Sequence, residues 1–308
     1  MRFAVFQATS VGDRVKNEDR AGYSYSREAL LMVVADGMGG HMAGDRAAEV
    51  AVLVLAKAFS LVAKPRVPDP ATFLAHAFID AHFAVNEIVA KSDGERDRQP
   101  RTTLVAALVQ EGVVWTAHVG DSRCYHLRAG KVLFRTSDHS QAQLLLQQGE
   151  LSEAELRHHP ARNRLLASIG GQEVPRVEFG RRITLQPNDV IALCSDGLWG
   201  QLDDSEIASR LAAPNLEWAT QSLVDEAVVR AAGRSDNVTL LTMRWLEASA
   251  SDEKTAWLDT SQTTGCVTSI FTQVEETAPS DFLLTDEDVE RAIEEINETI
   301  EKFRRDRG

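Results

Sequence analysis

The sequence predicts an α+β protein in which helices and sheets form packed layers, and three observations lead to this prediction. Short apolar segments rich in Val, Ile and Leu are mixed with longer segments that carry apolar residues at helical spacing. The order is strands, two long helices, many strands, two helices and a strand, which is not the regular alternation of a doubly wound sheet. With hydrophobic residues at 44% of 308, the chain can bury a core of normal size.

The individual elements follow from these patterns. Strands are predicted where the chain is continuously apolar, over 4–9, 30–35, 103–109, 113–119, 190–194 and 238–243. Helices are predicted where apolar residues recur every three or four positions, over 44–59, 70–90, 141–148, 205–211 and 216–232. These patterns alone leave the topology open.

A change of composition after residue 246 divides the chain into three predicted parts. Residues 1–246 form the main domain, and 247–281 form a linker rich in Ser and Thr. Residues 282–308 predict an amphipathic helix with Thr285 as its N-cap and an apolar stripe between positions 289 and 303. Two interpretations of the stripe stay open: it packs on the main domain, or it docks a partner or a second copy.

The charge balance and the termini restrict the class of protein. A net charge of -13 and a pI of about 5.1 argue against nucleic acid or an anionic membrane as the main partner. The N-terminus lacks a signal-peptide pattern, and the longest apolar run, 47–55, is too short to span a bilayer. The three cysteines are widely spaced, which favours buried thiols in a reducing compartment. We therefore expect a cytoplasmic protein.

Four aspartates lie where a predicted strand meets a tight turn. They are Asp36, Asp121, Asp196 and Asp236. One such residue could simply form a turn or cap a helix, but four, together with Glu18 and Asp19, indicate a shared site. Carboxylates gathered at one end of a sheet repel one another unless cations neutralise them. An all-oxygen set of ligands favours Mg²⁺ or Mn²⁺ over softer metals.

Several motifs occur in a fixed order around these residues. They are RVKNED at 14–19, VADGMGGH at 34–41, GDSR at 120–123, DHS at 138–140, SDGLW at 195–199 and SDNVT at 235–239. As an ordered set they resemble the motifs of the metal-dependent type 2C serine/threonine protein phosphatases, the PPM family, of bacterial type. The resemblance covers roughly residues 2–245.

This resemblance implies a fold and an activity. The fold would be a four-layer α-β-β-α sandwich of two antiparallel sheets flanked by helices. The activity would be hydrolysis of phosphoserine and phosphothreonine in proteins by a water that two metal ions activate, without a phosphoenzyme. Two or three Mn²⁺ or Mg²⁺ ions would be the cofactors. Phosphoproteins would be the substrates, and a Hanks-type serine/threonine kinase would be the counterpart.

The resemblance also assigns the ligands of the two catalytic metals. Asp36 would bridge both ions, and the carbonyl of Gly37 would bind one of them. Asp196 and Asp236 would bind the other ion. Glu18 would hold a metal-bound water.

Two further roles follow from the same resemblance. Asp121, together with Asp196, would form a weaker third-metal site. Arg14 would bind the substrate phosphate, for which a guanidinium has suitable bidentate geometry. The catalytic residues would thus be Arg14, Asp36 and Asp196.

The chain departs from the family pattern in a few places. Met38 stands where some members have a His, so the general acid stays open between His41 and a metal-bound water. Arg101 stands before a Thr pair where the family commonly has Gly. The segment 148–171 resembles the family's variable flap, whose basic residues either bind a phosphorylated loop or are simply solvated. These residues are His158, His159, Arg162 and Arg164.

Two other functions would use the same fold or the same kind of metal site. A catalytically silent regulatory binding module with the same fold would be expected to lack Asp36, Asp196 or Asp236, and all three are present. A two-metal nuclease would be expected to carry a basic stripe, which this acidic chain lacks.

Overall fold

Two antiparallel sheets form the centre of the fold in the computed structural model, which describes residues 1–38, 44–90, 99–156, 159–246, 258–263 and 265–271. The first sheet has the strand order β13 (Leu258–Asp259), β1 (Arg2–Ser10), β12 (Val238–Trp245), β11 (Val190–Cys194), β7 (Arg123–Arg128) and β8 (Lys131–Arg135). The second has the order β10 (Ile183–Thr184), β6 (Val113–Val119), β5 (Leu104–Gln110), β3 (Ala29–Met38), β2 (Asp19–Tyr25) and β14 (Val267–Phe271). Two short strands join the second sheet, β4 (Arg101–Thr102) beside β3 and β9 (Glu178–Phe179) beside β6.

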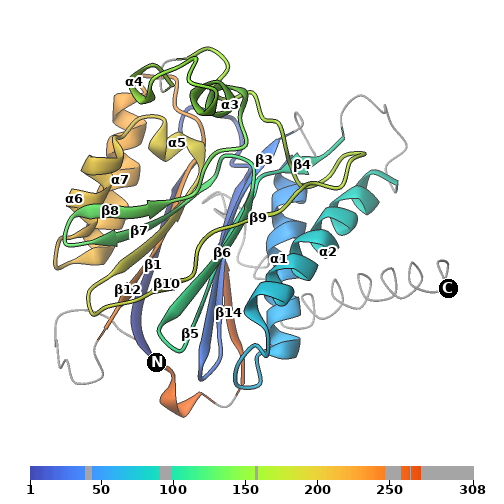
Figure 1. The fold of residues 1–308 in the computed structure, drawn as a ribbon, viewed down its shortest axis with the longest axis vertical. Coiled ribbons are helices and arrows are strands. Elements are labelled where there is room, and N and C mark those ends of the chain that lie inside the picture. Colours follow the sequence, from blue (N-terminus) through green and yellow to red (C-terminus); the bar gives the residue numbers. More distant parts are fainter. Residues whose placement is uncertain (39–43, 91–98, 157–158, 247–257, 264, 272–308) are drawn as a thin grey trace. The chain divides into compact units, whose positions relative to one another are not determined.

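Helix pairs cover the outer faces of the sheets (Figure 1). The long helices α1 (Gly44–Val62) and α2 (Pro70–Ala90) pack on the second sheet, and α6 (Asp204–Leu211) and α7 (Leu216–Arg230) pack on the first. The remaining helices are short; they are α3 (Gln141–Gln147), α4 (Glu153–Leu156), α5 (Asp196–Trp199) and the 3₁₀ turn η1 (Thr260–Gln262). The four-layer α-β-β-α sandwich is thereby confirmed.

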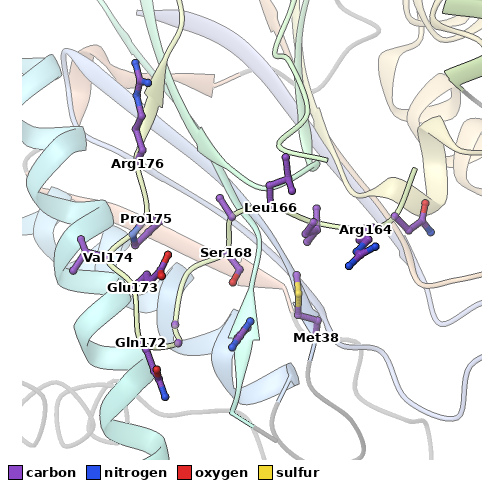
Figure 2. A pocket seen from close by; sticks show the side chains of 15 residues that line it. Met38, Arg164, Leu166, Ser168, Gln172, Glu173, Val174, Pro175 and Arg176 are labelled. Atoms are coloured by element: carbon purple, nitrogen blue, oxygen red, sulfur yellow. The ribbon is translucent and has the colours of Figure 1, made fainter. Parts of the chain in front are cut away.

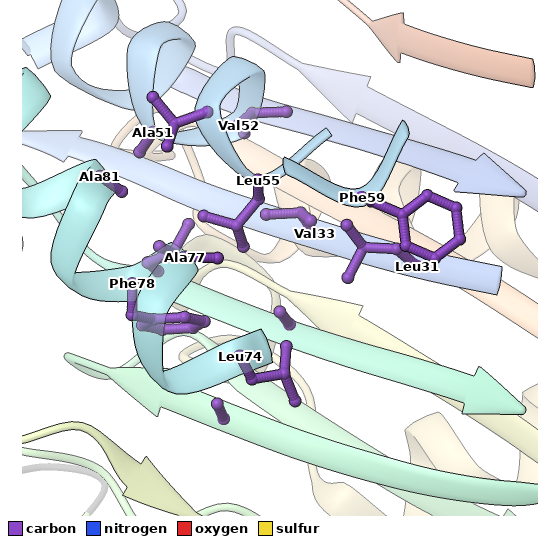
Figure 3. Close-up of a cluster of buried hydrophobic side chains, with 14 of the residues drawn as sticks. Leu31, Val33, Ala51, Val52, Leu55, Phe59, Leu74, Ala77, Phe78 and Ala81 are labelled. Carbon is purple, nitrogen blue, oxygen red and sulfur yellow. The ribbon is translucent and has the colours of Figure 1, made fainter. Parts of the chain in front are cut away.

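Strand β3 shows why the central strands are apolar on both faces. Alternate side chains of a strand point to opposite sides. Leu31, Val33 and Ala35 pack against α1 and α2, where they meet side chains such as Leu55 and Phe78 (Figure 3). The intervening residues face the other sheet; they are Leu30, Met32 and Val34. Full burial of each such large aliphatic side chain contributes about 1.5–3 kcal/mol, which favours this layered arrangement.

Local signals fix the beginnings of several helices. Ser140 and Asn215 precede α3 and α7, and each side chain accepts a hydrogen bond from the backbone N–H three residues later. Asp203 and Glu206 form a reciprocal capping box at the start of α6. These caps satisfy N–H groups that would otherwise lack partners.

Most of the strands and helices predicted from apolar patterns are confirmed. Strands β6 and β11 and helix α2 have the predicted bounds, and β1, β3, β5, β12, α1, α3, α6 and α7 differ by a few residues at their ends. Strands β2, β7 and β8 were not predicted, because they carry charged residues and lack a continuous apolar run. Among the described residues, none of the helices has the length and apolar character needed to cross a bilayer.

The segment expected as a linker differs from that expectation in part. Residues 258–259 form β13 and pair with β1, and Val267–Phe271 forms β14 and pairs with β2. The folded unit therefore extends to Phe271 rather than ending at 246. The predicted C-terminal helix over 282–308 lies outside the described residues.

Candidate metal centre

Three aspartates from distant parts of the chain meet in space. Asp36 lies near the end of β3, Asp196 begins α5 directly after β11, and Asp236 lies two residues before β12. Each is partly exposed to solvent, so an ion could reach it. Asp36 and Asp196 interact electrostatically with each other, and the charge of Asp236 acts on both. The structure brings these three residues together, while their roles as ligands stay predictions.

The electrostatics of this cluster show a shortage of positive charge. Burial raises the pKa of Asp36 well above its usual value, and four neighbouring aspartates raise it further. Burial and the charge of Asp236 raise the pKa of Asp196 to about 6, although Arg162 and Arg14 oppose this shift. Carboxylates in such surroundings are stabilised by divalent cations, and oxygen ligands suit hard ions. The donor set therefore fits Mg²⁺ or Mn²⁺.

The backbone of Asp36 is held by a pair of threonines. The backbone N–H of Thr103 donates to the carbonyl of Asp36 at 2.8 Å, and the N–H of Asp36 donates to Thr103 Oγ1 at 3.0 Å. The hydroxyl of Thr102 donates to the same carbonyl at 2.9 Å. Arg101, which departs from the family pattern, lies in β4 opposite Met38 of β3. The contacts of Thr102 and Thr103 with Asp36 are present beside it.

Gly37 is required by close packing of the backbone. A Cβ atom at this position would lie 2.2 Å from the carbonyl oxygen of Gly44 and 2.8 Å from that of Glu18. The side chain of Glu18 lies against Gly44 at the start of α1, where burial and the charge of Asp45 raise the pKa of Glu18. Glu18 therefore lies beside the residues around Gly37, as a residue holding a water near that carbonyl would.

Asn237 connects the N-terminal loop to Asp236. Its Oδ1 accepts from the N–H of Glu18 at 2.8 Å, and its Nδ2 donates to the carbonyls of Val11 and Lys16 at 2.9 and 3.0 Å. Its own N–H donates to Asp236 Oδ1 at 2.8 Å. The sequence identifies Asn237 only as part of a motif, whereas in the structure its hydrogen bonds position both Glu18 and Asp236.

Asp19, which the sequence pattern includes in the shared site without a specific role, is a further member of the cluster. It pairs directly with Asp36 across β2 and β3, and only 3% of it is exposed. Its Oδ2 accepts from Ser195 Oγ at 2.7 Å, while its Oδ1 has no hydrogen-bond partner among the described residues. Burial raises the pKa of Asp19 to about 7, against the hydrogen bonds from Ser195 and Thr239. An orphaned buried oxygen beside Asp36 suits a cation or its water.

Asp121 lies in the turn after β6, next to Asp196. Gly120 adopts a φ of 105°, a left-handed conformation that favours glycine. The Asp121 carbonyl accepts from Trp199 Nε1 at 2.9 Å. Burial and the charges of Asp196 and Asp138 raise the pKa of Asp121 well above its usual value. This placement is compatible with the predicted third-metal site.

Arg14 lies on the solvent side of the cluster. Its Nη2 is 2.7 Å from Asp236 Oδ2, and 59% of its side chain is exposed. The charges of Asp196 and Asp36 also act on it, so the guanidinium faces the carboxylates. An anion that approaches from solvent would meet Arg14.

A pocket of about 820 Å³ includes Met38 in its lining (Figure 2). Met38 lies two residues after Asp36, and the chain between 163 and 176 forms most of the wall. Its charged lining residues are Arg101, Arg164, Arg176 and Glu173. The pocket is thus locally basic in an acidic protein. Arg164 and Arg162 from the predicted flap lie at the pocket and near Asp196, respectively.

The other candidate groups take no part in the cluster as the structure describes it. Met38 carries no transferable proton, and His41 and His158 lie outside the described residues. Cys124 and Cys194 are fully buried in β7 and β11, and burial raises the pKa of both thiols, that of Cys124 to about 12. Neither thiol is therefore a nucleophile, as the sequence predicted.

Comparison with known proteins gives a consistent set of relatives. Residues 10–231 match the family described as protein phosphatase 2C. The serine/threonine phosphatase stp of Listeria monocytogenes is 34% identical over 233 residues, which are 74% of this chain and 90% of that protein.

Two solved structures have the same fold. The serine/threonine phosphatase of S. agalactiae superposes with a TM-score of 0.72 at 29% identity, over 80% of this chain and all of the other. The catalytic domain of the serine threonine protein phosphatase PstP, in complex with 2 manganese ions, superposes with a TM-score of 0.64 at 27% identity, over 80% of this chain and 99% of the other.

Proposed function

The chain belongs to the protein phosphatase 2C family, and from this premise we propose that it hydrolyses phosphoserine and phosphothreonine in proteins with the help of bound divalent cations. The observation that carries the proposal is the meeting of Asp36, Asp196 and Asp236, three partly exposed carboxylates with too little positive charge around them. The PstP relative is described in complex with manganese ions, which supports Mn²⁺ or Mg²⁺ as the cofactor.

The residues that would hold the ions are those assigned from the resemblance. Asp36 and the Gly37 carbonyl would bind one ion, and Asp36, Asp196 and Asp236 the other, with Glu18 holding a coordinated water. To these we add Asp19, whose buried Oδ1 has no hydrogen-bond partner among the described residues and would hold a further water. When bound, two such ions lower the pKa of a water and shield the phosphoryl oxygens. Thr102 and Thr103 keep the Asp36 backbone in place, and Asn237 does the same for Asp236. A third ion would be held by Asp121 with Asp196.

Arg14 would orient the phosphate. Its guanidinium can donate two parallel hydrogen bonds to phosphoryl oxygens. In the structure it donates to Asp236 instead, through an exposed ion pair of the kind that contributes little to stability. Exchanging that partner for a phosphate oxygen therefore costs little, and it brings the substrate beside the carboxylates.

The basic pocket would receive the peptide around the phosphorylated residue. Arg101, Arg164 and Arg176 line it against a single acidic residue, Glu173, so acidic or phosphorylated segments would bind best. In an acidic protein this local charge favours approach of the substrate at this face. The substrates would be phosphoproteins modified by a Hanks-type kinase in the cytoplasm.

A test requires activity and its metal dependence in the full chain. We expect hydrolysis of p-nitrophenyl phosphate and of a phosphothreonine peptide with Mn²⁺ or Mg²⁺, and none in excess chelator. Asp36→Asn should abolish both activities, whereas the exposed Asp225→Asn on α7 should leave them unchanged. Undiminished turnover in chelator would contradict the proposal. A wild-type chain that binds metal and phosphopeptide without turnover would instead favour the regulatory binding module.

A further inference from the structure

A second group of candidate ligands lies beside strand β6 and shares no residue with the carboxylate cluster. His118 is on β6, His139 precedes α3, and Glu178 is on β9, which pairs with β6 directly opposite His118 (Figure 1). One ligand atom from each of the three side chains lies within 4.8 Å of the other two. Segments far apart in the sequence thus place two imidazoles and a carboxylate together.

His118 has a buried ring nitrogen that makes no hydrogen bond among the described residues. Only 1% of the residue is exposed, and its Nε2 lies 2.7 Å from the carbonyl oxygen of Ser137. A carbonyl only accepts hydrogen bonds, so Nε2 carries the proton and Nδ1 of the neutral ring is an acceptor. That Nδ1 is the nitrogen without a partner in the part of the chain that the structure describes. Burial and the neighbouring His139 lower the pKa of His118, which keeps the ring neutral.

His139 and Glu178 complete the group and open it to solvent. The rings of His118 and His139 have centroids 4.6 Å apart, and His139 Nε2 lies 3.2 Å from Glu178 Oε2. The Glu178 side chain is 51% exposed and that of His139 15%, so an ion could enter from this side. The N–H of Gly120 reaches His139 Nδ1 at 3.3 Å, a long and therefore weak contact.

We propose that His118 Nδ1, His139 Nε2 and Glu178 form a binding site for a borderline-soft divalent cation such as Zn²⁺. Two imidazoles and one carboxylate, with water in the fourth position, are a common zinc ligand set, whereas the all-oxygen cluster suits Mg²⁺ or Mn²⁺. Zinc–nitrogen distances of about 2.0–2.1 Å place tetrahedral ligands about 3.4 Å apart. The side chains must therefore close by roughly 1 Å, which the half-exposed Glu178 permits.

Binding moves one proton on His139. Without the ion, the Gly120 N–H donates to Nδ1, so the proton of the neutral ring lies on Nε2 and faces Glu178. When the ion binds Nε2, this proton moves to Nδ1, and the contact from the Gly120 N–H is lost. Gly120 directly precedes Asp121, the predicted third-metal ligand. Loss of the Gly120 contact would therefore alter the turn that positions Asp121. Glu178 also lies two residues after Arg176, which lines the pocket. An ion bound to Glu178 and His118 would therefore restrict the movement of this part of the pocket lining relative to β6.

Titration of the full chain with Zn²⁺ in a large excess of Mg²⁺ tests this site. Imidazole ¹⁵N chemical shifts should show metal binding at His118 Nδ1 and His139 Nε2 and no other ring changing in step. Competition with a chromophoric chelator gives the affinity. Glu178→Gln should weaken binding at least about tenfold, since it replaces an anionic ligand on an exposed edge strand. Glu217→Gln, a surface change at the start of α7, is the matched control and should bind like wild type.

The result is separable from the phosphatase proposal, because the zinc site should persist in Asp36→Asn. Two outcomes would overturn the inference: unchanged ¹⁵N shifts of both rings at saturating Zn²⁺, or equal zinc affinity in wild type and Glu178→Gln. His139→Gln provides a second variant with the same expected loss of affinity as Glu178→Gln. Neither variant removes a side chain from the interior of the sheets.

Discussion

An aspartate lies at each end of strand β11, and the surroundings of the two shift their pKa values in opposite directions. Asp189, before the strand, is fully buried, and Arg128 donates to both of its oxygens at 2.7 Å. Burial alone would raise the pKa of Asp189, but the hydrogen bonds from Arg128, Gln186 and His126 more than offset this and lower it. Asp196, after the strand, has other aspartates as close neighbours, and its pKa is raised to about 6.

The difference indicates a structural role for the Asp189 end and a functional role for the Asp196 end. At the Asp189 end, the chain supplies the neutralising cation itself, Arg128, and the result is a structural ion pair between the start of β11 and the end of β7. At the Asp196 end, carboxylates lie together with Arg14 and Arg162 as partial compensation only. Buried like charges without sufficient partners reduce stability, and proteins retain such arrangements mainly at functional sites. Substitutions at either end of β11 and changes of pH should therefore have opposite effects on stability and catalysis.

The largest effect is expected for Asp196→Asn on catalysis. Loss of one ligand that stabilises transition-state charge corresponds to about 4 kcal/mol, or roughly 10³-fold in kcat/KM. Because a repelling charge is removed, the metal-free protein should unfold at the same or a higher urea concentration than wild type. Steady-state kinetics and urea titration measure both. A variant that is less stable without metal would contradict the electrostatic contrast.

The next effect is expected for Asp189→Asn on stability. This change removes the buried partner and leaves the Arg128 guanidinium, whose side chain is 32% exposed, without its carboxylate. Because water can screen that charge, the loss of stability should stay below the roughly 3 kcal/mol at which the cost of breaking a fully buried pair begins. Urea unfolding measures it, with the exposed Asp225→Asn as control. kcat of the folded fraction should stay at the wild-type value, and a large fall in kcat would show that the two ends of β11 are not independent.

The pH dependence of the metal-free protein should follow the raised pKa values. Asp19 and Asp196 have pKa values of about 7 and about 6 in the folded state, above the ordinary value near 4. The folded state therefore binds more protons than the unfolded state between these limits, so the free energy of unfolding falls as pH rises from 5 to 7. We expect a loss on the order of 2 kcal/mol in chelator.

The same measurement with Mg²⁺ provides the control. Cations that take the place of the protons should remove this fall, because the charged carboxylates then have partners. Asp189 does not contribute to this pH dependence. Because its pKa is lowered in the folded state, its protonation reduces the free energy of unfolding only below about pH 4. A free energy of unfolding that rises between pH 5 and 7 in chelator would refute the expectation.

A smaller effect is expected for Ser195→Ala. The Ser195 hydroxyl is fully buried, donates to Asp19 and accepts from the Thr239 N–H at 3.0 Å. Removing it leaves two buried groups with fewer partners, which should cost about 1.5 kcal/mol. Thermal or urea unfolding checks this. The loss should be greater at pH 8 than at pH 5, because the hydroxyl stabilises the charged form of Asp19.

The smallest effect is expected for Arg14→Ala. Its exposed ion pair with Asp236 should contribute less than about 0.5 kcal/mol to stability. If Arg14 orients phosphate, kcat/KM should fall about tenfold, mainly through KM, which corresponds to about 1.4 kcal/mol. Kinetics at fixed Mn²⁺ measure this, with Arg210→Ala on α6 as a control for surface charge. An unchanged KM would remove Arg14 from substrate binding.

The extent of prediction from sequence follows from where each residue finds its partners. The strands β3, β6, β11 and β12 were visible because packed layers on both faces require continuous apolar residues. Strand β7 could not be predicted in this way, because an arginine such as Arg123 is expected on the surface unless a buried partner is known. In the structure that partner is Asp138. That pair, with Trp199 stacked 3.7 Å from the guanidinium, depends on contacts between distant segments.

The site shows the same division. Asp36, Asp196 and Asp236 were recognisable because each borders an apolar strand and a turn. The position of Asp19 was not, because β2 was not predicted and its register opposite Asp36 could not be known. The bridging role of Asn237 likewise depends on a loop conformation that no periodic pattern encodes.

The pairing of β14 with β2 has a practical consequence for anyone who shortens this protein. Val267–Phe271 covers the backbone edge of β2, and Ser24 and Thr268 hydrogen-bond across the pair at 2.8 Å. A version cut at residue 246, where the motif-bearing part ends, would leave that edge bare. An exposed strand edge can pair with strands of other molecules, so the shortened protein should aggregate during purification. A version that ends just past Phe271 should remain in solution.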